Sequence, residues 1–536
     1  MVVLDGASLT IDSLAAVAEG RDEIALAPVA RDRMAAAREV VEEALRSDAA
    51  VYGLTTALAE RKSVVLDAAA RPGFSRFLIR GHLIAQGPPA PVPVVRAAMA
   101  CLVNGYAKGT AGVRPELAEM ILGALNRGLT PAVRSLGSVG QADLGPMADL
   151  AEGLLRETGF VLEPGEGLAL VNSNALSTGW AALAELSAER LLGEADVAAA
   201  LDLEAFAANL SPLHPVAAEV RPYPGLGVTL GRLRALLAGS WLFEPGNARN
   251  LQDPLTFRGI PQIHGAARDA LAYVRNTIET ELNSAQGNPA VVLAERRIVS
   301  VANLEAVPVA AALDFARIAL APVVTSAAER AVKLLQSPLS GLPAGLAAEP
   351  DTGEDTLAEF AGAAQAIAAE ARTLAHPVSY ELVSSSKAEG IEDRTTMAPL
   401  SARRLAEMAD LAARVISLEL LVAAQAIDLR RPSRLGEGTG RALRLVRELV
   451  PFTARGQAPP AELEPLVDAV RAGRLARAAG PGQLPVPPRS PDDHFTRPCA
   501  LSAQSVRRTV GPCRTTSCSR LRNGCPPVLS PIPSAR

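Results

Sequence analysis

The chain has 536 residues, of which 49% are hydrophobic, 3% aromatic and 21% charged, and its formal net charge is -4. This length allows two or more domains with a large core. The small negative charge excludes a general electrostatic attraction to nucleic acid or to anionic membranes. The first ten residues contain no basic region followed by a long apolar run, so they do not form a signal peptide, and apolar segments such as 318–328 are too short to span a bilayer. We therefore expect a cytoplasmic protein with neither nucleic-acid nor membrane partners.

The first 130 residues show short helical patterns separated by loops. A loop is expected at 51–56, within residues 7–70. Helical periodicity resumes over 96–129 and is interrupted by Gly109 and Gly112. The sequence predicts separate helices on the two sides of these glycines.

Residues 136–149 are the most informative stretch. Gly137 and Gly140 predict a tight loop. Apolar residues then recur at steps of three and four from Leu144 to Leu155, which predicts an amphipathic helix with Asp143 as its N-cap. Such a helix end carries unpaired amide donors and the positive end of the helix dipole, so it suits a site where negative charge develops.

The rest of the chain is dominated by helical patterns. Residues 168–177 are expected to form a buried turn that leads into a helix. The apolar spacing from Met408 to Val422 is typical of packing between long helices. The segment 436–440 is glycine-rich, but no strand pattern precedes it, so we interpret it as a loop and not as a nucleotide-binding motif. The fold class is therefore mainly α, with a smaller N-terminal active-site domain (1–200) and a long-helix bundle (201–484).

Residues 485–536 are rich in Pro, Ser and Arg and contain four of the five cysteines, at separations that match no zinc site. This stretch is interpreted as a disordered tail. A genuine tail and a frameshifted or read-through end explain the change in composition equally well. No metal site is expected.

An ordered series of motifs resembles the aromatic amino acid ammonia-lyases, that is, the histidine, phenylalanine and tyrosine lyases, from about residue 4 to about residue 455. Besides the 136–149 stretch, the matching segments are Leu4-Asp-Gly6, Gly112-Val-Arg-Pro-Glu-Leu117, Gln252-Asp-Pro254, Pro261-Gln-Ile-His-Gly265, Asn288-Pro289, Ser340-Gly-Leu-Pro343, Leu374-Ala-His-Pro377 and Glu392-Asp393. The resemblance implies a mainly helical, ammonia-lyase-like fold, a small amino acid substrate and a homotetramer whose sites take residues from more than one subunit.

The electrophile loop departs from this family. Its members carry Gly-Ser-Val-Gly-Ala-Ser-Gly-Asp, in which the Ala-Ser-Gly triplet becomes a methylidene-imidazolone group. Here Gly140 is followed directly by Gln141, Ala142 and Asp143, so the triplet and its serine are missing. Ser138 is not flanked by Ala and Gly and is not expected to cyclise. We therefore expect neither a methylidene-imidazolone group nor any other cofactor.

The resemblance also implies roles for individual residues. Tyr52 matches the tyrosine that acts as a base on the substrate β-carbon, and Asn172 matches the asparagine that lies against the electrophile and the substrate. Arg258 matches the arginine that holds the substrate carboxylate, for which a planar guanidinium is well suited. Each residue also has a purely structural interpretation: a packed loop tyrosine, an amide in a buried turn and a salt-bridged arginine, respectively.

His82 and Glu392 match positions where the histidine lyases contact the imidazole ring, and together they can donate hydrogen bonds to a heterocycle and accept them from it. Other pocket positions differ from the family. Leu255 replaces a second active-site tyrosine, and Leu304 replaces a phenylalanine. The shape of the substrate pocket is therefore not fixed by the resemblance.

These observations lead to two hypotheses and one weaker possibility. The first is a carbon–nitrogen lyase that eliminates an amine from an aromatic, imidazole-like amino acid or its betaine without the methylidene-imidazolone group. The family contains such a branch, the ergothionase-like enzymes, which release trimethylamine from a histidine betaine. The second is a non-catalytic homologue that acts as a binding or partner subunit. A gene that has lost selection is the weaker possibility.

Overall fold

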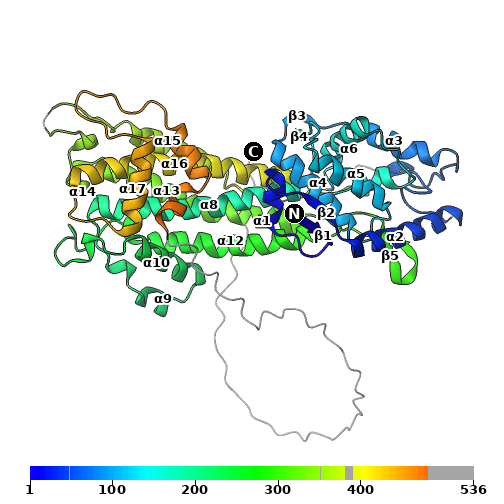
Figure 1. Ribbon diagram of the computed structural model, residues 1–536, viewed down its shortest axis with the longest axis horizontal. Helices are drawn as coiled ribbons and strands as arrows, with labels where there is room; N and C mark the ends of the chain where they lie inside the picture. Colours follow the sequence, from blue (N-terminus) through cyan, green and yellow to red (C-terminus); the bar gives the residue numbers. More distant parts are fainter. Residues whose placement is uncertain (48, 351, 381–389, 481–536) are drawn as a thin grey trace, which may run out of the picture. The chain divides into compact units, whose positions relative to one another are not determined.

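The structure, a computed structural model, describes residues 1–480 except residues 48, 351 and 381–389. Long helices that pack against one another form its centre (Figure 1). They are α8 (Ala175–Phe206), α12 (Ile260–Leu282), α13 (Val307–Leu334) and α16 (Ala398–Arg430). The predicted mainly helical fold with a long-helix bundle is confirmed.

The central helix α8 is buried on nearly all sides. Apolar and small residues occur around its whole circumference, as is typical of a helix surrounded by others. They are interspersed with five buried acids, Glu185, Glu194, Asp196, Asp202 and Glu204. Gly179 lies where α4 (Val92–Tyr106) approaches, and a Cβ at this position would be only 2.9 Å from the backbone nitrogen of Ala98. This glycine therefore permits close packing between α8 and α4.

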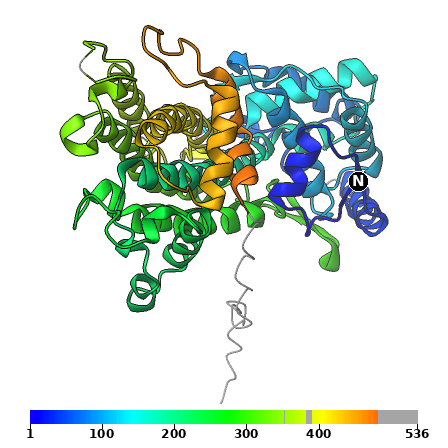
Figure 2. The same cartoon turned by 60° about the vertical axis from the view of Figure 1, so that its left-hand side comes forward.

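Most of the shorter elements before α8 gather at one end of the bundle (Figure 1 and Figure 2). The helices are α1 (Ile11–Ala18), α2 (Pro28–Arg46), α3 (Arg71–Gly81), α4, α5 (Pro115–Asn126), α6 (Leu144–Thr158) and α7 (Glu166–Val171). The strands form short pairs. They are the parallel pair β1 (Val2–Leu4) and β2 (Ile24–Leu26), and the antiparallel pairs β3 (Gln86–Pro89) with β4 (Arg134–Leu136) and β5 (Ala290–Val292) with β6 (Arg297–Val299).

The remaining α-helices come after α8 in the sequence. They are α9 (Val216–Val220), α10 (Pro224–Leu236), α11 (Leu255–Arg258), α14 (Ser337–Ser340), α15 (Phe360–Thr373), α17 (Glu437–Leu449), α18 (Glu464–Arg471) and α19 (Arg474–Ala479). Met1–Leu484 is one compact unit, and α8 runs through residue 200, where we placed a domain boundary, without interruption. The predicted tail, 485–536, and the end of the predicted second domain lie outside the described residues.

The glycine-rich segment 436–440 differs from its interpretation as a loop, because α17 begins at Glu437. A Cβ at Gly436 would lie 2.6 Å from the carbonyl oxygen of Leu236, and one at Gly438 would lie 2.8 Å from the Cα of the same leucine. These glycines therefore allow α17 to approach the end of α10. From the sequence these glycines indicated a loop, but in the structure they permit close packing between helices.

Helix α13 contains the apolar segment 318–328, which we expected to be too short to span a bilayer, within 28 residues that also include charged side chains. By length and composition it could cross one, but 56% of its most apolar stretch is buried inside the fold. The Arg317 and Arg330 side chains on this helix are fully buried and paired with acids. These contacts identify α13 as a core helix of the bundle.

Candidate active site

A cavity of about 760 Å³ lies among the loops around the end of α3, the start of α6 and the end of α7. It brings together most of the site residues predicted from the sequence: Tyr52, His82, Gln141, Asn172 and Glu392. Because these residues come from distant parts of the chain, the fold itself assembles the site.

Tyr52 lies in the loop before the 3-10 turn Ala59–Arg61. Thr55 holds this loop, because its hydroxyl donates to the carbonyl of Ala49 at 2.6 Å and accepts from the Val51 amide at 2.8 Å. The phenol oxygen of Tyr52 accepts a hydrogen bond from the amide of Ala59 at 3.2 Å. A donor at this oxygen stabilises negative charge on it, which is what a tyrosine acting as a base requires.

The loop 140–142 is closed by hydrogen bonds from three separate segments. The Gly140 carbonyl accepts from the Asn174 amide group at 3.0 Å and from the Thr396 hydroxyl at 2.8 Å. The Gln141 side chain donates to Oε2 of Glu305 at 2.9 Å. Ala142 adopts a left-handed conformation with φ of 57°. Hydrogen bonds from distant segments thus hold the shortened loop in place.

Asp143 occupies the N-cap position of α6 as predicted, but its side chain makes no capping hydrogen bond to that helix. Its fully buried carboxylate instead accepts from the Ser177 amide at 2.7 Å, from the Ser177 hydroxyl at 2.7 and 2.8 Å, and from the Ser138 hydroxyl at 3.0 Å. Burial raises the pKa of Asp143, while these hydrogen bonds oppose the shift. The N-cap position is thus confirmed, but the carboxylate bonds to the first turn of α8 and not to the first turn of α6.

The loop does not suit the methylidene-imidazolone group. Forming that group requires a serine hydroxyl that is lost as water, and neither Gln141 nor Ala142 carries one. The nearby Ser138 donates its hydroxyl to Asp143 and is followed by Val139, not glycine. Among the described residues there is also no group of three or more His, Cys, Asp or Glu side chains arranged for a metal.

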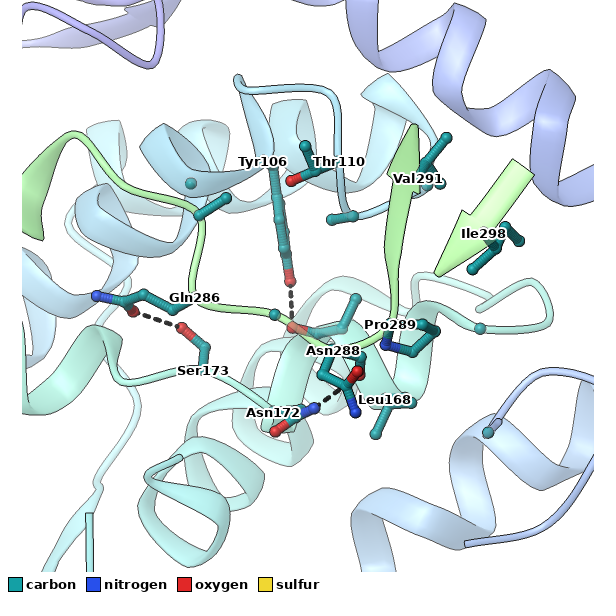
Figure 3. Close-up of a pocket in the computed structure, with 18 of the residues that line it drawn as sticks. Tyr106, Thr110, Leu168, Asn172, Ser173, Gln286, Asn288, Pro289, Val291 and Ile298 are labelled. Atoms are coloured by element: carbon teal, nitrogen blue, oxygen red, sulfur yellow. Dashed lines mark hydrogen bonds between the residues drawn. The ribbon is translucent and has the colours of Figure 1, made fainter. Parts of the chain in front are cut away.

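Asn172 ends α7 and is 8% exposed. Its side-chain nitrogen donates to the backbone carbonyl of Asn288 at 2.8 Å, as Figure 3 shows. A second, smaller cavity of about 70 Å³ shares Tyr52, Leu168, Asn172 and Asn288 with the large one. Asn172 therefore lies in the wall between the two cavities, with its amide orientation set by the backbone of residue 288.

His82 and Glu392 both line the large cavity. The Nδ1 atom of His82 lies 2.8 Å from the carbonyl of Leu78, which can only accept, so we assign the ring proton to Nδ1. Nε2 of a neutral His82 is then a hydrogen-bond acceptor. Nε2 of His82 and the carboxylate of Glu392 can both accept hydrogen bonds, so they can recognise a ring that carries N–H groups.

Arg258 lies far from this cavity within one chain. It ends α11, and its Nε donates to the carbonyl of Asp253 at 3.1 Å. The neighbouring Phe257 stacks on Phe206, at the C-terminal end of α8, with ring centroids 4.1 Å apart. The cavity lies at the other end of α8, and a helix of 32 residues is roughly 45 Å long. A single chain therefore does not bring Arg258 to Tyr52.

Three further cavity residues were missed from the sequence. Phe74 and Phe77 belong to one face of α3 and form an apolar part of the wall. Glu305 bonds Gln141 and also accepts from Nε of Arg394 at 3.1 Å. The i, i+3 spacing of the two phenylalanines could have indicated an apolar helix face at the site. The sequence offered no comparable signal for Glu305, because the neighbouring Leu304 is notable only for replacing an aromatic residue of the family.

The chain is similar to known proteins of one family. The family profile described as aromatic amino acid lyase matches residues 9–448. The histidine ammonia-lyase of Stigmatella aurantiaca is 35% identical over 499 residues, which cover 89% of this chain and 97% of that protein. The histidine ammonia-lyase of Caldanaerobacter subterraneus subsp. tengcongensis is 31% identical over 497 residues, covering 88% and 97% of the two chains.

Solved structures with the same fold include two enzymes of this kind. Ergothionase from Treponema denticola superposes with a TM-score of 0.83 at 26% identity, covering 88% of this chain and 99% of that one. Histidine ammonia-lyase from Trypanosoma cruzi superposes with a TM-score of 0.80 at 30% identity, covering 89% and 94%.

Proposed function

The chain belongs to the aromatic amino acid lyase family and is a carbon–nitrogen lyase, and we propose that it eliminates an amine from an aromatic amino acid or its betaine without a methylidene-imidazolone group. The observation that carries this proposal is the loop 140–143. It lacks the serine of the electrophile, yet hydrogen bonds hold it in the wall of a cavity that retains Tyr52 and Asn172.

In the proposed reaction, the Tyr52 oxygen removes a proton from the substrate β-carbon. The electrons of that C–H bond form the Cα–Cβ double bond, and the C–N bond breaks with its electron pair on nitrogen. A trimethylammonium group leaves as neutral trimethylamine and needs no prior activation. A primary amine leaves less readily, and each 1.36 kcal/mol of missing activation costs a factor of ten in rate. A betaine is therefore the substrate class that best fits a site without the electrophile.

The imidazole-like side chain is proposed from His82 and Glu392, which line the same cavity. The apolar face of α3 at Phe74 and Phe77 suits the flat faces of an aromatic ring. The Treponema denticola enzyme is described as ergothioneine-degrading, and its structure holds desmethyl-ergothioneine sulfonic acid. That likeness supports an imidazole-bearing betaine over other aromatic substrates.

We also propose that the working form is a homotetramer in which Arg258 from another subunit binds the substrate carboxylate. The support is the separation of roughly 45 Å along α8 between Arg258 and the cavity of its own chain. Tyr273 and Phe315, which pack edge to face at 6.1 Å between α12 and α13, are 54% and 46% exposed. Exposed aromatic residues of this kind are enriched where subunits meet. The tetramer is proposed to act in the cytoplasm.

The test is to supply histidine and N,N,N-trimethylhistidine separately and to measure both the α,β-unsaturated acid and the released amine. We expect turnover of the betaine at a higher rate than that of histidine. Tyr52→Phe should lower kcat by about 10²- to 10⁴-fold, the usual contribution of general acid–base catalysis. If neither substrate yields an unsaturated acid, the proposal is wrong.

One observation favours the alternative of a non-catalytic homologue. Leu304 lines the cavity at the position where the family has a phenylalanine, and Leu255 on α11 replaces an active-site tyrosine. Tight binding of a substrate without formation of product, or copurification with an active relative, would support this alternative.

A further inference from the structure

The loop 140–142, at the position where the family carries its electrophile, is hydrogen-bonded to a carboxylate from a distant segment. The backbones of Gln141 and Glu305 pair as an isolated β-bridge, and the Gln141 side chain donates to Oε2 of Glu305 at 2.9 Å. Glu305 lines the large cavity together with Tyr52 and Asn172. Its side chain is therefore held against the loop, in the same cavity as the groups that would act on the substrate.

The charge of Glu305 is only partly matched by the described residues. Oε2 accepts from Arg394 at 3.1 Å, but the Arg394 side chain is 54% exposed, so solvent screens this ion pair. The Glu305 side chain is 31% exposed, but its Oε1 atom is buried and has no hydrogen-bond partner among the described residues. A carboxylate oxygen removed from water without a donor is unfavourable unless a ligand supplies a compensating charge or donor.

We propose that Glu305 binds the cationic nitrogen of the substrate, either an ammonium or a trimethylammonium group attached to the α-carbon. An ammonium group can donate a hydrogen bond to the carboxylate. A trimethylammonium group carries the same charge without a donor and would be held by electrostatic attraction alone. Gln141 is a positioning residue in this arrangement, because it orients the carboxylate. The inference rests on the proposed function and adds the recognition of the leaving nitrogen to it.

Glu305 should act on binding more than on the chemical step. The positive charge on nitrogen is lost as the neutral amine departs, so a nearby carboxylate stabilises the bound substrate at least as well as the transition state. Interactions of this kind lower KM without raising kcat. Replacing Glu305 should therefore raise KM while kcat stays within a small factor.

The experiment compares ligands that differ only at nitrogen. Dissociation constants are measured by calorimetry for histidine, N,N,N-trimethylhistidine and imidazolepropionate, which has the same ring and carboxylate but no amine. The full-length protein carries Tyr52→Phe to prevent turnover. Glu305→Gln is added to this background, with Glu60→Gln as the matched control, because Glu60 is an exposed acid on the 3-10 turn beside the cavity.

We expect Glu305→Gln to weaken binding of both cationic ligands by roughly tenfold or more, the effect of losing one interaction with a charged group. Binding of imidazolepropionate should change by less than about twofold, which sets this role apart from a structural one, since a displaced loop would weaken all three ligands. Loss for histidine alone would assign the contact to an ammonium donor. Loss for both would assign it to charge.

Equal weakening of all three ligands, or no weakening of the cationic ones, would overturn the inference. So would a protein that binds none of them. If the protein with Tyr52 intact turns over substrate, but Glu305→Gln does not change the relative affinities for the three ligands, this inference is refuted and the lyase proposal stands. If Glu305→Gln selectively weakens the cationic ligands, but the protein with Tyr52 intact shows no turnover, this inference stands and the lyase proposal is refuted.

Discussion

Asp143 connects the shortened loop to the first turn of α8, and its replacement tests whether this connection holds the site together. The carboxylate is fully buried and accepts hydrogen bonds from the Ser177 amide, the Ser177 hydroxyl and the Ser138 hydroxyl. Asp143→Ala removes every one of these acceptors. Asp143→Asn keeps the shape and one acceptor oxygen, so it separates the loss of charge from the loss of the contact.

The loss of the carboxylate affects the three hydrogen-bond donors to different extents. The Ser177 and Ser138 hydroxyls can rotate toward other acceptors. The Ser177 amide cannot, because it lies in the first turn of α8, where backbone amides have no partner within the helix. An orphaned buried amide costs about 1–3 kcal/mol, and each weakened hydroxyl bond about 1 kcal/mol. We expect Asp143→Ala to destabilise this region by about 3–5 kcal/mol and Asp143→Asn by about half as much.

Hydrogen exchange followed by mass spectrometry reports this effect locally. Peptides covering 135–156 and the start of α8 should exchange faster in Asp143→Ala, whereas peptides from the middle of α16 should be unchanged. Turnover should fall by at least about tenfold, because small displacements of catalytic groups are costly. Wild-type exchange in both variants would refute the assignment of Asp143 as the anchor of the loop.

Three further predictions follow from buried groups. Burial raises the pKa of Glu194 from 4.5 to about 8, so between these pH values the folded state keeps a proton that the unfolded state releases. The free energy of unfolding, relative to that of Glu194→Gln, should therefore fall as pH rises from about 4.5 to 8, by up to about 4–5 kcal/mol. Denaturation curves recorded over this pH range measure the difference. Gly140→Ala should cost about 1–3 kcal/mol and most of the activity, because φ is 82° and a Cβ would collide with a threonine hydroxyl; unchanged kinetics would contradict this. Arg330→Met should lower stability by about 3–5 kcal/mol, since it leaves the fully buried Asp202 and Glu419 carboxylates without their cation, and an unchanged melting temperature would count against it.

Much of the helical fold could be predicted from local patterns. The start of α6 after Asp143 and the separation of α4 from α5 follow from apolar spacing and glycine positions. The apolar series predicted from Met408 ends at Val422, yet α16 continues to Arg430. Within this extension the buried Gln425 amide exchanges hydrogen bonds with the backbone of Thr453. A partner 28 residues away is invisible to a periodicity argument.

Site residues that belong to family motifs could be predicted from the sequence. Contacts between residues far apart in the chain could not. Tyr52, His82 and Asn172 do line one cavity. The main partner of Asp143, Ser177, lies 34 residues away on another helix, so the sequence favoured a local cap instead. Glu305 has no motif of its own, and only its contact with Gln141 across the fold reveals it.

The most direct test of the central claim is the mass of the loop measured on a sample that is turning over substrate. Trypsin should release residues 135–156 as one peptide, because no Lys or Arg lies between Arg134 and Arg156. We predict that this peptide has its unmodified mass in protein that converts N,N,N-trimethylhistidine to the unsaturated acid. A peptide lighter by the loss of water, in protein that deaminates histidine, would contradict the account.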